Sequence, residues 1–256
     1  MSTHPASPPI VLITGGSRGL GRSMALQLAQ QGSDIVLTYR SEAGEAQAVV
    51  AAIEAYGRRA VALPLDVGDT STFPAFLEAT GAALAGWGRD RLDALVNNAG
   101  MGVHAAFADT TEAQFDALVN VHLKGPFFLT AALLPLIADG GRILNVSSGL
   151  TRFSVPGYAA YAAMKGAIEV LSRYQAKELG ARGISVNTLA PGAIATDFGG
   201  GAVRDNPQLN TYLASQTALG RVGEADDIGG MVASLLSPAS RWINGQRIEA
   251  SGGMFL

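Results

Sequence analysis

The sequence predicts a single α/β domain built around a parallel sheet, and three observations carry this prediction. Short continuous apolar runs, such as residues 10–13, recur along the chain, as expected for strands buried on both faces of a sheet. Stretches with apolar residues at helical spacing follow these runs, beginning with residues 24–29. A glycine-rich turn, residues 14–21, joins the first run to the first helical stretch, an order typical of nucleotide-binding domains.

The composition is that of a compact globular protein with no strong charge. The 256 residues are 48% hydrophobic and 15% charged, with a net charge of −3. We therefore expect no nucleic acid and no membrane as a partner. The chain has no cysteine, and its histidines (His4, His104 and His122) lack the spacing of metal ligands, so we expect no metal site.

The two ends of the chain differ in pattern. Residues 1–9 are polar and Pro-rich, with no basic segment followed by an apolar one, and no apolar run approaches the roughly 18 residues of a membrane span. We expect a short flexible tail on a cytoplasmic protein. Residues 10–256 contain no linker and no repeat, so we expect one domain.

The glycine turn predicts a phosphate-binding site. Glycines let the backbone turn tightly and approach a pyrophosphate, and the N-terminus of the next helix presents free N–H groups to its charge. The residues of this turn expected to bind a cofactor are Thr14, Gly15, Ser17, Arg18, Gly19, Leu20 and Gly21.

The end of the second strand, residues 35–38, bears on the choice of cofactor. An NAD site usually has an acidic residue here, which holds the adenosine ribose. This chain has Tyr39, Arg40 and Ser41 instead. Together with Arg18, Arg40 can hold a 2′-phosphate, so NADPH is expected in preference to NADH. The alternative is that both arginines are solvated surface charges.

Two further strand ends carry candidate cofactor contacts. After a helix over 43–56, the strand 60–65 ends in Asp66-Val67, and Asp66 either bonds an adenine amino group or caps a helix over 71–86. The strand 92–96 ends in two amides and two small residues, which suit a backbone lying close to a cofactor. The expected contacts there are Asn98, Ala99 and Gly100.

A long helix is expected over 111–137, with Asn120 inside it. An amide in an apolar helix is costly unless it is hydrogen-bonded, and Asn120 could reach Lys165 through an ordered water. The apolar side of this helix is expected to consist of Phe115, Leu118, Val119, Leu123, Phe127 and Phe128.

The catalytic prediction rests on Ser148, Tyr161 and Lys165. Ser148 follows the apolar strand 142–147, at the carboxyl end where a hydroxyl faces the cleft. Tyr161 and Lys165 lie four positions apart in a helix over about 156–180, so they share one face. A free tyrosine has a pKa of roughly 10, and a fixed cation beside it lowers that value toward neutrality, which suits proton transfer.

The remaining chain predicts a strand over 184–190, a helix over 224–236 and a strand over 247–249. Between the first two, residues 198–222 lose any regular pattern and begin near three glycines, 199–201. An irregular stretch of this length is more typical of a lid than of a passive connection, so we expect a substrate lid at about 196–222.

In order and spacing, these motifs resemble those of the classical short-chain dehydrogenases/reductases (SDR) over essentially the whole chain from Ile10. The resemblance implies a Rossmann-type, doubly wound sheet of about seven parallel strands flanked by helices, and a homotetramer or homodimer. The matching residues are Thr14, Gly19, Gly21, Asp66, Val67, Asn97, Asn98, Ala99, Gly100, Asn120, Ser148, Tyr161, Lys165, Pro191 and Gly192.

The resemblance also implies a role for each site residue. Tyr161 would exchange the proton, Ser148 would hold the substrate carbonyl, and Lys165 would bind the nicotinamide ribose. Asn120 would hold a relay water. Pro191, Gly192, Ile194 and Thr196 would contact the nicotinamide end of the cofactor.

Two residues rival this assignment. Ser147 adjoins Ser148, but the family spacing selects Ser148. Tyr158 lies three residues before Tyr161, but it has Ala162 four positions on rather than a lysine.

The expected function is NADPH-dependent reduction of a small ketone or aldehyde. A 3-oxoacyl-ACP reductase is the first alternative, opposed by Asp139, which stands where that branch has a basic partner for Arg182 near the site entrance. The others are an NAD-dependent alcohol or sugar dehydrogenase and a non-catalytic NADPH-binding regulator. The expected pocket residues are Met101, His104, Leu150, Phe153 and Tyr158.

Overall fold

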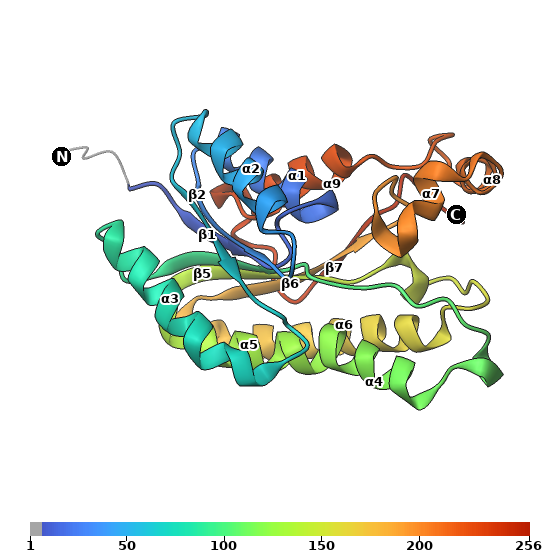
Figure 1. The fold of residues 1–256 in the computed structure, drawn as a ribbon, viewed down its shortest axis with the longest axis horizontal. Helices are drawn as coiled ribbons and strands as arrows, with labels where there is room; N and C mark the ends of the chain where they lie inside the picture. Colours follow the sequence, from blue (N-terminus) through green and yellow to red (C-terminus); the bar gives the residue numbers. More distant parts are fainter. Residues whose placement is uncertain (1–6) are drawn as a thin grey trace.

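The computed structural model describes residues 7–256, so most of the expected tail, 1–9, lies outside the described residues. Within this part of the chain, seven strands form one parallel sheet in the order β3-β2-β1-β4-β5-β6-β7 (Figure 1), confirming the predicted doubly wound fold. The strands are β1 (Ile10–Ile13), β2 (Asp34–Tyr39), β3 (Ala60–Pro64), β4 (Leu92–Asn97), β5 (Ile137–Val146), β6 (Ser185–Pro191) and β7 (Arg247–Ala250).

Helices cover both faces of this sheet, and Figure 1 shows the two layers. One face carries α1, α2 and α9, and the other carries α3, α4, α5 and α6. The helices are α1 (Gly19–Gln30), α2 (Ala43–Glu54), α3 (Phe73–Gly86), α4 (Glu112–Val119), α5 (Gly125–Leu133), α6 (Ala159–Leu179), α7 (Ala202–Asp205), α8 (Pro207–Ser215) and α9 (Ala225–Leu235).

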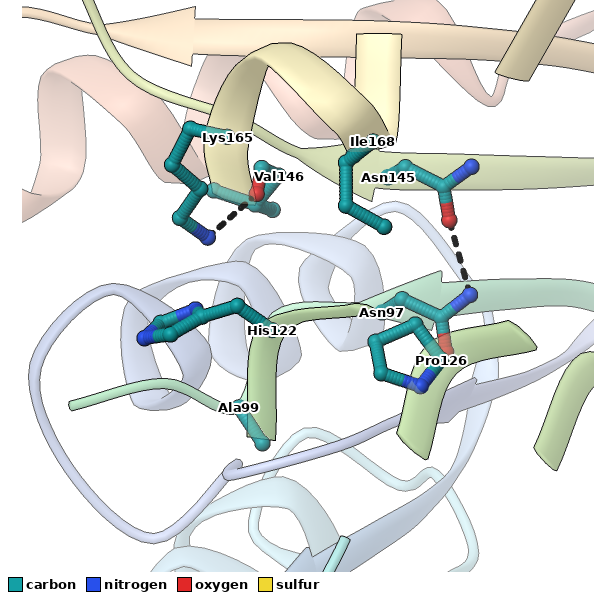
Figure 2. A pocket seen from close by; sticks show the side chains of 8 residues that line it. All are labelled: Asn97, Ala99, His122, Pro126, Asn145, Val146, Lys165 and Ile168. Atoms are coloured by element: carbon teal, nitrogen blue, oxygen red, sulfur yellow. Dashed lines mark hydrogen bonds between the residues drawn. The ribbon is translucent and has the colours of Figure 1, made fainter. Parts of the chain in front are cut away.

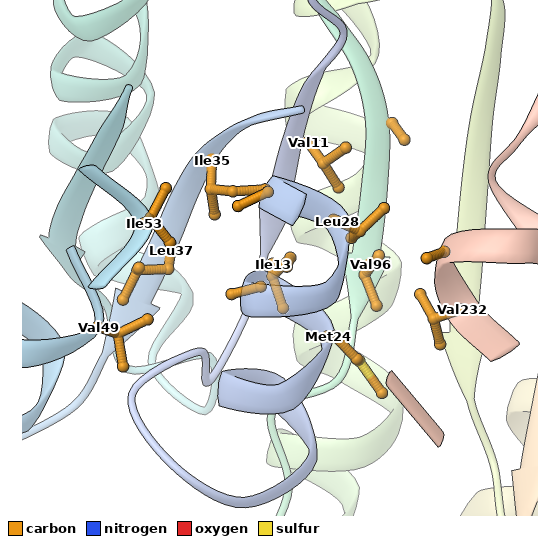
Figure 3. Packing of buried hydrophobic residues seen from close by; sticks show 14 of the residues in the cluster. Val11, Ile13, Met24, Leu28, Ile35, Leu37, Val49, Ile53, Val96 and Val232 are labelled. Carbon is orange, nitrogen blue, oxygen red and sulfur yellow. The ribbon is translucent and has the colours of Figure 1, made fainter. Parts of the chain in front are cut away.

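The first strand shows why the apolar runs are continuous. Val11 and Ile13 pack on the α1 side, in the cluster drawn in Figure 3, whereas Ile10 and Leu12 pack on the α3 side. Successive side chains of a strand point to opposite faces, so a strand covered on both faces needs apolar residues at every position.

The strand order changes direction next to β1. The chain runs outward from β1 through β2 to β3 on one side, and then returns to place β4 on the other side of β1. Because all strands are parallel, their carboxyl ends lie along one edge of the sheet. Ligands of open α/β sheets bind in the crevice outside this edge, at the reversal. The loops that follow β1, β4, β5 and β6 carry the predicted site residues there.

The helix expected over 111–137 is interrupted. A π turn over Asn120–Lys124, closed by the bond from Gly125 N to Asn120 O, separates α4 from α5. Its buried side was predicted only in part. Leu118 is fully buried as expected, and Val119 and Leu123 pack against its cluster. Three phenylalanines assigned to the same side, Phe115, Phe127 and Phe128, are 42, 47 and 50% exposed, whereas His122 and Leu129, which were not assigned to it, bury 99% or more of their surface.

By length and apolar composition alone, the helical stretch Glu112–Leu136 resembles a membrane span, although no single run of its apolar residues is that long. In this fold the same stretch packs Leu129 and Leu133 into the core beneath the sheet. Packing therefore accounts for part of its apolar composition, since 39% of the most apolar part of the stretch is buried.

The segment expected to be irregular, 198–222, contains two short helices, α7 and α8. A 3₁₀ turn with Gly199, Gly200 and Gly201 at positive φ precedes them. Beyond α8, Thr217 forms a bridge with Met254, which ties the segment to the C-terminal residues.

Candidate active site

The glycine turn is held to two neighbouring strand ends by hydrogen bonds. Thr14 is buried, and its Oγ1 accepts bonds from the backbone N–H groups of Asn98 and Ala99, each at 3.0 Å. Asn98 Nδ2 donates to the carbonyls of Thr14, at 2.9 Å, and Gly15, at 3.1 Å. Thr14 and Asn98 therefore brace the turn from within.

Two of the glycines are required by the close packing of this turn. Gly15 has a φ of +67°, and a Cβ there would lie 3.0 Å from the Cα of Ala99. A Cβ on Gly21 would collide with the carbonyl oxygen of Gly15. The turn leads directly into α1, which has no acidic residue in its first turn. This cradle fits a dinucleotide pyrophosphate.

Three exposed arginines surround the adenosine end of this cradle. Among the described residues, Arg18, Arg22 and Arg40 have no ion-pair or side-chain hydrogen-bond partner. Ser41 Oγ donates to Glu42 at 3.2 Å, and Tyr39 is half-buried at the end of β2. The cations fit the phosphate-rich end of a dinucleotide.

The predicted contacts at the other strand ends also border the turn. The carboxylate of Asp66 accepts a bond from Gly68 N at 2.8 Å, and Asp69, not Asp66, caps the 3₁₀ turn before α3. Thr196 lies 3.7 Å from the Cβ position of Gly19.

Further along the same edge, Val67 is buried, Pro191 ends β6, and Gly192 N donates to Ala250 O at 3.0 Å. The tip of Ile194 packs against Gly223, and a Cβ on Gly100 would lie 2.9 Å from His122.

Ser148, Tyr161 and Lys165 converge at the carboxyl end of β5. Ser148 acts on the Tyr161 phenol and lowers its pKa, and only 7% of Tyr161 is exposed. Lys165 Nζ lies 5.6 Å from the centre of the Tyr161 ring and donates to the Val146 carbonyl at 2.8 Å. This arrangement brings a hydroxyl, a phenol and an ammonium together, as the sequence predicted.

The protonation of this group differs from the expectation. Burial raises the pKa of the Tyr161 phenol above its usual value, and Ser148 only partly opposes this rise. Burial also lowers the pKa of Lys165 to about 7. Burial is thus the main influence on the phenol pKa, while the Lys165 ammonium donates to a backbone carbonyl and lies 5.6 Å from the ring centre.

The rival residues have structural roles. Ser147 Oγ donates to the Lys165 carbonyl at 3.2 Å and to Glu169 at 2.8 Å, so it fastens β5 to α6. Tyr158 packs edge-on against His104, with ring centres 5.1 Å apart, and lies 6.5 Å from the Tyr161 ring.

His122 lines a small cavity next to Lys165, together with Asn97 and Asn145 (Figure 2). Asn120 is not part of this lining, and its Cβ lies toward Gly68. Sequence reasoning missed His122 because it weighed the histidines only as metal ligands and took Asn120 as the relay residue. His122 follows the fully buried Leu118 by four residues, which was the available signal.

The residues expected to line a substrate pocket lie in two places. Met101, Leu150 and Tyr158 pack around Tyr161. Phe153 instead packs against Phe255, with ring centres 4.8 Å apart, because the chain turns back toward the C-terminus there.

Phe198, at the start of the segment 198–222, packs against the Tyr161 ring at 5.8 Å between centres. This segment therefore borders the catalytic group.

Known proteins resemble this chain along its whole length. A family model described as Enoyl-(Acyl carrier protein) reductase matches residues 15–255. The NADPH-dependent aldehyde reductase-like protein, chloroplastic, of Arabidopsis thaliana is 36% identical over 276 residues, covering 99% of each chain. The 3-oxoacyl-(acyl-carrier-protein) reductase FabG of Staphylococcus aureus is 36% identical over 247 residues, covering 96% of this chain and 97% of its own.

A solved structure resembles it equally closely. The angucycline C-6 ketoreductase LanV with bound NADP is 37% identical with a TM-score of 0.92, covering 96% of this chain and 95% of its own. LanV has also been solved with NADP and rabelomycin together.

Proposed function

This chain belongs to the short-chain dehydrogenase/reductase family, and from that premise we propose that it reduces free small ketones or aldehydes with NADPH. The observation that carries the proposal is the convergence of Ser148, Tyr161 and Lys165 beside the glycine turn. Ala99 connects the two, because it packs against Gly15 and also lines the cavity next to Lys165.

The cofactor would be held by the cradle described above, and when bound it supplies the hydride that reduces the carbonyl carbon. Ser148 holds the carbonyl oxygen, and Tyr161 gives that oxygen its proton as negative charge develops. Tyr161 is protonated near neutrality and so has the proton to give, although its raised pKa does not in itself make the phenol a stronger acid. Lys165 contributes the nearby positive charge.

The preference for NADPH over NADH rests on Arg18 and Arg40. Both are exposed, lie at the adenosine end, and have no carboxylate partner among residues 7–256, so their guanidinium groups are available to a 2′-phosphate. Replacement of Arg40 by Ala is expected to raise the KM for NADPH by about tenfold or more and to change that for NADH little. Arg241→Ala, at an exposed arginine outside this site, is the control. An equal loss with both cofactors would contradict the preference.

The carrier-protein alternative is opposed by an ion pair. Arg182 Nε lies 2.7 Å from Asp139 Oδ1, and its other nitrogens donate to the carbonyls of Leu134 and Ile137. Arg182 is therefore already neutralised. Within one chain the pair also lies at the amino end of β5, opposite Ser148, and not near the site entrance as expected.

Two further features belong to this proposal. The segment 196–222 would act as the substrate lid, since Phe198 contacts Tyr161 and three glycines with positive φ follow it. A homotetramer or homodimer would cover the apolar surface of the helices, which includes Phe115, Phe127, Phe128, Val170 and Tyr174.

The function is tested by the loss of absorbance at 340 nm. NADPH and NADH are compared on an activated ketone, and then on a 3-oxoacyl thioester offered free and on its carrier protein. Turnover of small ketones with little response to the carrier supports the proposal. Rapid turnover only with the carrier-bound thioester would instead place the protein in fatty-acid synthesis, and no NADPH oxidation with any carbonyl would remove the reductase.

A further inference from the structure

The cavity beside Lys165 contains an unexplained polar atom. His122 is 1% exposed, and its Nδ1 has no hydrogen-bond partner among the described residues. Asn97 Oδ1, from the same cavity lining, is the other buried side-chain atom without a partner. Figure 2 shows a ring nitrogen of His122 on the side facing the Lys165 ammonium. A buried acceptor without a partner costs about 1–3 kcal/mol, so such atoms need an explanation.

The tautomer of His122 is defined by its other nitrogen. Nε2 lies 2.7 Å from the Met101 carbonyl and 3.3 Å from the Met101 amide, and the shorter contact requires Nε2 to carry the proton and donate it. Burial and the charge of Lys165 lower the pKa of His122 to about 3, so the ring is neutral. Nδ1 is then a lone-pair acceptor.

The size and the lining of the cavity match one water molecule. Its volume is about 10 Å³, close to the smallest space that holds one water. A water there would accept a hydrogen bond from Lys165 Nζ and donate one to His122 Nδ1, which gives it two polar partners. The Lys165 ammonium donates one of its hydrogen bonds to the Val146 carbonyl, so its other N–H groups can donate to this water.

We infer that His122 is a positioning residue, whose Nδ1 fixes a single buried water that accepts a hydrogen bond from Lys165. The inference rests on the proposed carbonyl reduction and gives His122 the role that the family resemblance had assigned to Asn120. His122 does not take up the proton. It orients the water, which holds the ammonium of Lys165 in place beside Tyr161.

Three substitutions separate this role from simple packing. The amide of His122→Asn keeps an acceptor where Nδ1 stands but loses the bond to Met101. The amide of His122→Gln reaches Met101 but has no acceptor at the Nδ1 position. His122→Phe keeps the ring and removes both nitrogens.

We expect kcat to fall about 10- to 100-fold in His122→Gln and His122→Phe and to be largely retained in His122→Asn, with the KM for NADPH unchanged within about twofold. Asn120→Ala is expected to lose less than either His122→Gln or His122→Phe. Activity retained by Gln and lost by Asn would mean that His122 acts only by anchoring Met101, and the inference would fail.

Two measurements do not depend on turnover. Nitrogen-15 NMR of histidine-labelled protein, assigned with His122→Phe, should show Nδ1 unprotonated and no titration of His122 between pH 6 and 9. A high-resolution crystal structure should show one water within hydrogen-bond distance of Nδ1 and Lys165. A protonated Nδ1 or an empty cavity would overturn the inference even if ketone reduction is observed. If the wild type does not oxidise NADPH with any carbonyl, the proposed function fails. The NMR result and the crystal structure would then still decide whether the water site exists.

Discussion

Buried charges at the two edges of the sheet differ in whether they have an ion-pair partner. At the amino edge, Asp34 is fully buried, and its carboxylate lies 2.6 Å from both the Arg58 and the Arg59 guanidinium groups. At the carboxyl edge, Lys165 is buried with no ion-pair partner among the described residues, and its pKa falls. Charges are satisfied where they only support the fold, and are left unpaired where they act on another molecule.

The largest effect is expected from Tyr161→Phe at the carboxyl edge. Loss of the phenol hydroxyl removes the proton donor, so kcat should fall by about 10²- to 10⁴-fold. NADPH affinity, measured by fluorescence titration, should stay nearly constant because the cradle is built from other residues. Tyr158→Phe, which removes a neighbouring hydroxyl, should cost much less. Full activity in Tyr161→Phe would refute the assignment.

At the amino edge, Asp34→Asn should destabilise the fold without affecting the chemistry. Burial alone would raise the pKa of Asp34, but bonds from Arg59 N and from the Arg58 and Arg59 side chains outweigh burial and lower it. Two partly exposed arginines would lose their counter-charge, so the free energy of unfolding in urea at pH 7 should fall by about 2–4 kcal/mol.

The pH dependence of this contribution follows from the lowered pKa. The stabilisation by Asp34 is present above its unfolded pKa of 3.8 and is lost as the pH falls through the lower folded value. The wild type and Asp34→Asn should therefore converge in acid. The highly exposed Asp90 provides the control, since Asp90→Asn should leave stability unchanged. A constant difference down to low pH would show that Asp34 acts through packing.

Lys165→Met should change how stability depends on pH. The folded pKa of Lys165 is about 7, against 10.5 for the free side chain, so between these values the unfolded chain binds more protons. Wild-type stability should thus rise with pH, by about 2 kcal/mol from pH 7 to 9, and this rise should be absent in Lys165→Met. Urea unfolding at both pH values measures it. Lys177→Met, on the exposed side of α6, should follow the wild type; parallel curves for all three would contradict the buried charge.

The smallest effect is expected from Asp139→Ala. Asp139 is 76% exposed, and an ion pair at such a surface contributes less than about 1 kcal/mol, so unfolding should barely change. Ketone reduction should be unaffected. If the substitution instead raises turnover of a carrier-bound thioester and leaves the free thioester unchanged, the freed Arg182 is binding the carrier.

Local pattern was enough to predict most of the fold. All seven strands were predicted, and most of them as apolar runs, because a strand covered on both faces needs apolar residues at every position; β7, at the edge of the sheet, is the exception. The glycine turn and the Tyr161–Lys165 pair were also predictable, because each is defined by residues that lie close together in the sequence. The two short helices α7 and α8 were missed because they are brief and lie mainly on the surface, so no apolar stripe marks them.

The burial of the residues after the π turn was mispredicted for a geometric reason. A straight helix turns 100° per residue, and extrapolation from Phe115 to Phe127 assumes that this rotation is constant. The π turn at Asn120–Lys124 spaces its closing bond by five residues, so it changes the phase of everything that follows. No residue type within the turn indicates this change of helical phase in the sequence. The protonation of Tyr161 also could not be predicted, because it depends on burial and on where the Lys165 ammonium points.

The π turn separates the fate of the reactive group from that of the hydrophobic core. A π turn is a helix carrying one extra residue, so deleting a single residue within 120–124 would restore an unbroken helix. Because the turn absorbs that residue locally, the deletion would leave α5 in its orientation relative to α4, with Leu129 and Leu133 still in the core. Only the side chains of the turn, His122 among them, would change direction. A frame-preserving loss of one codon should therefore spare folding and disturb the chemistry.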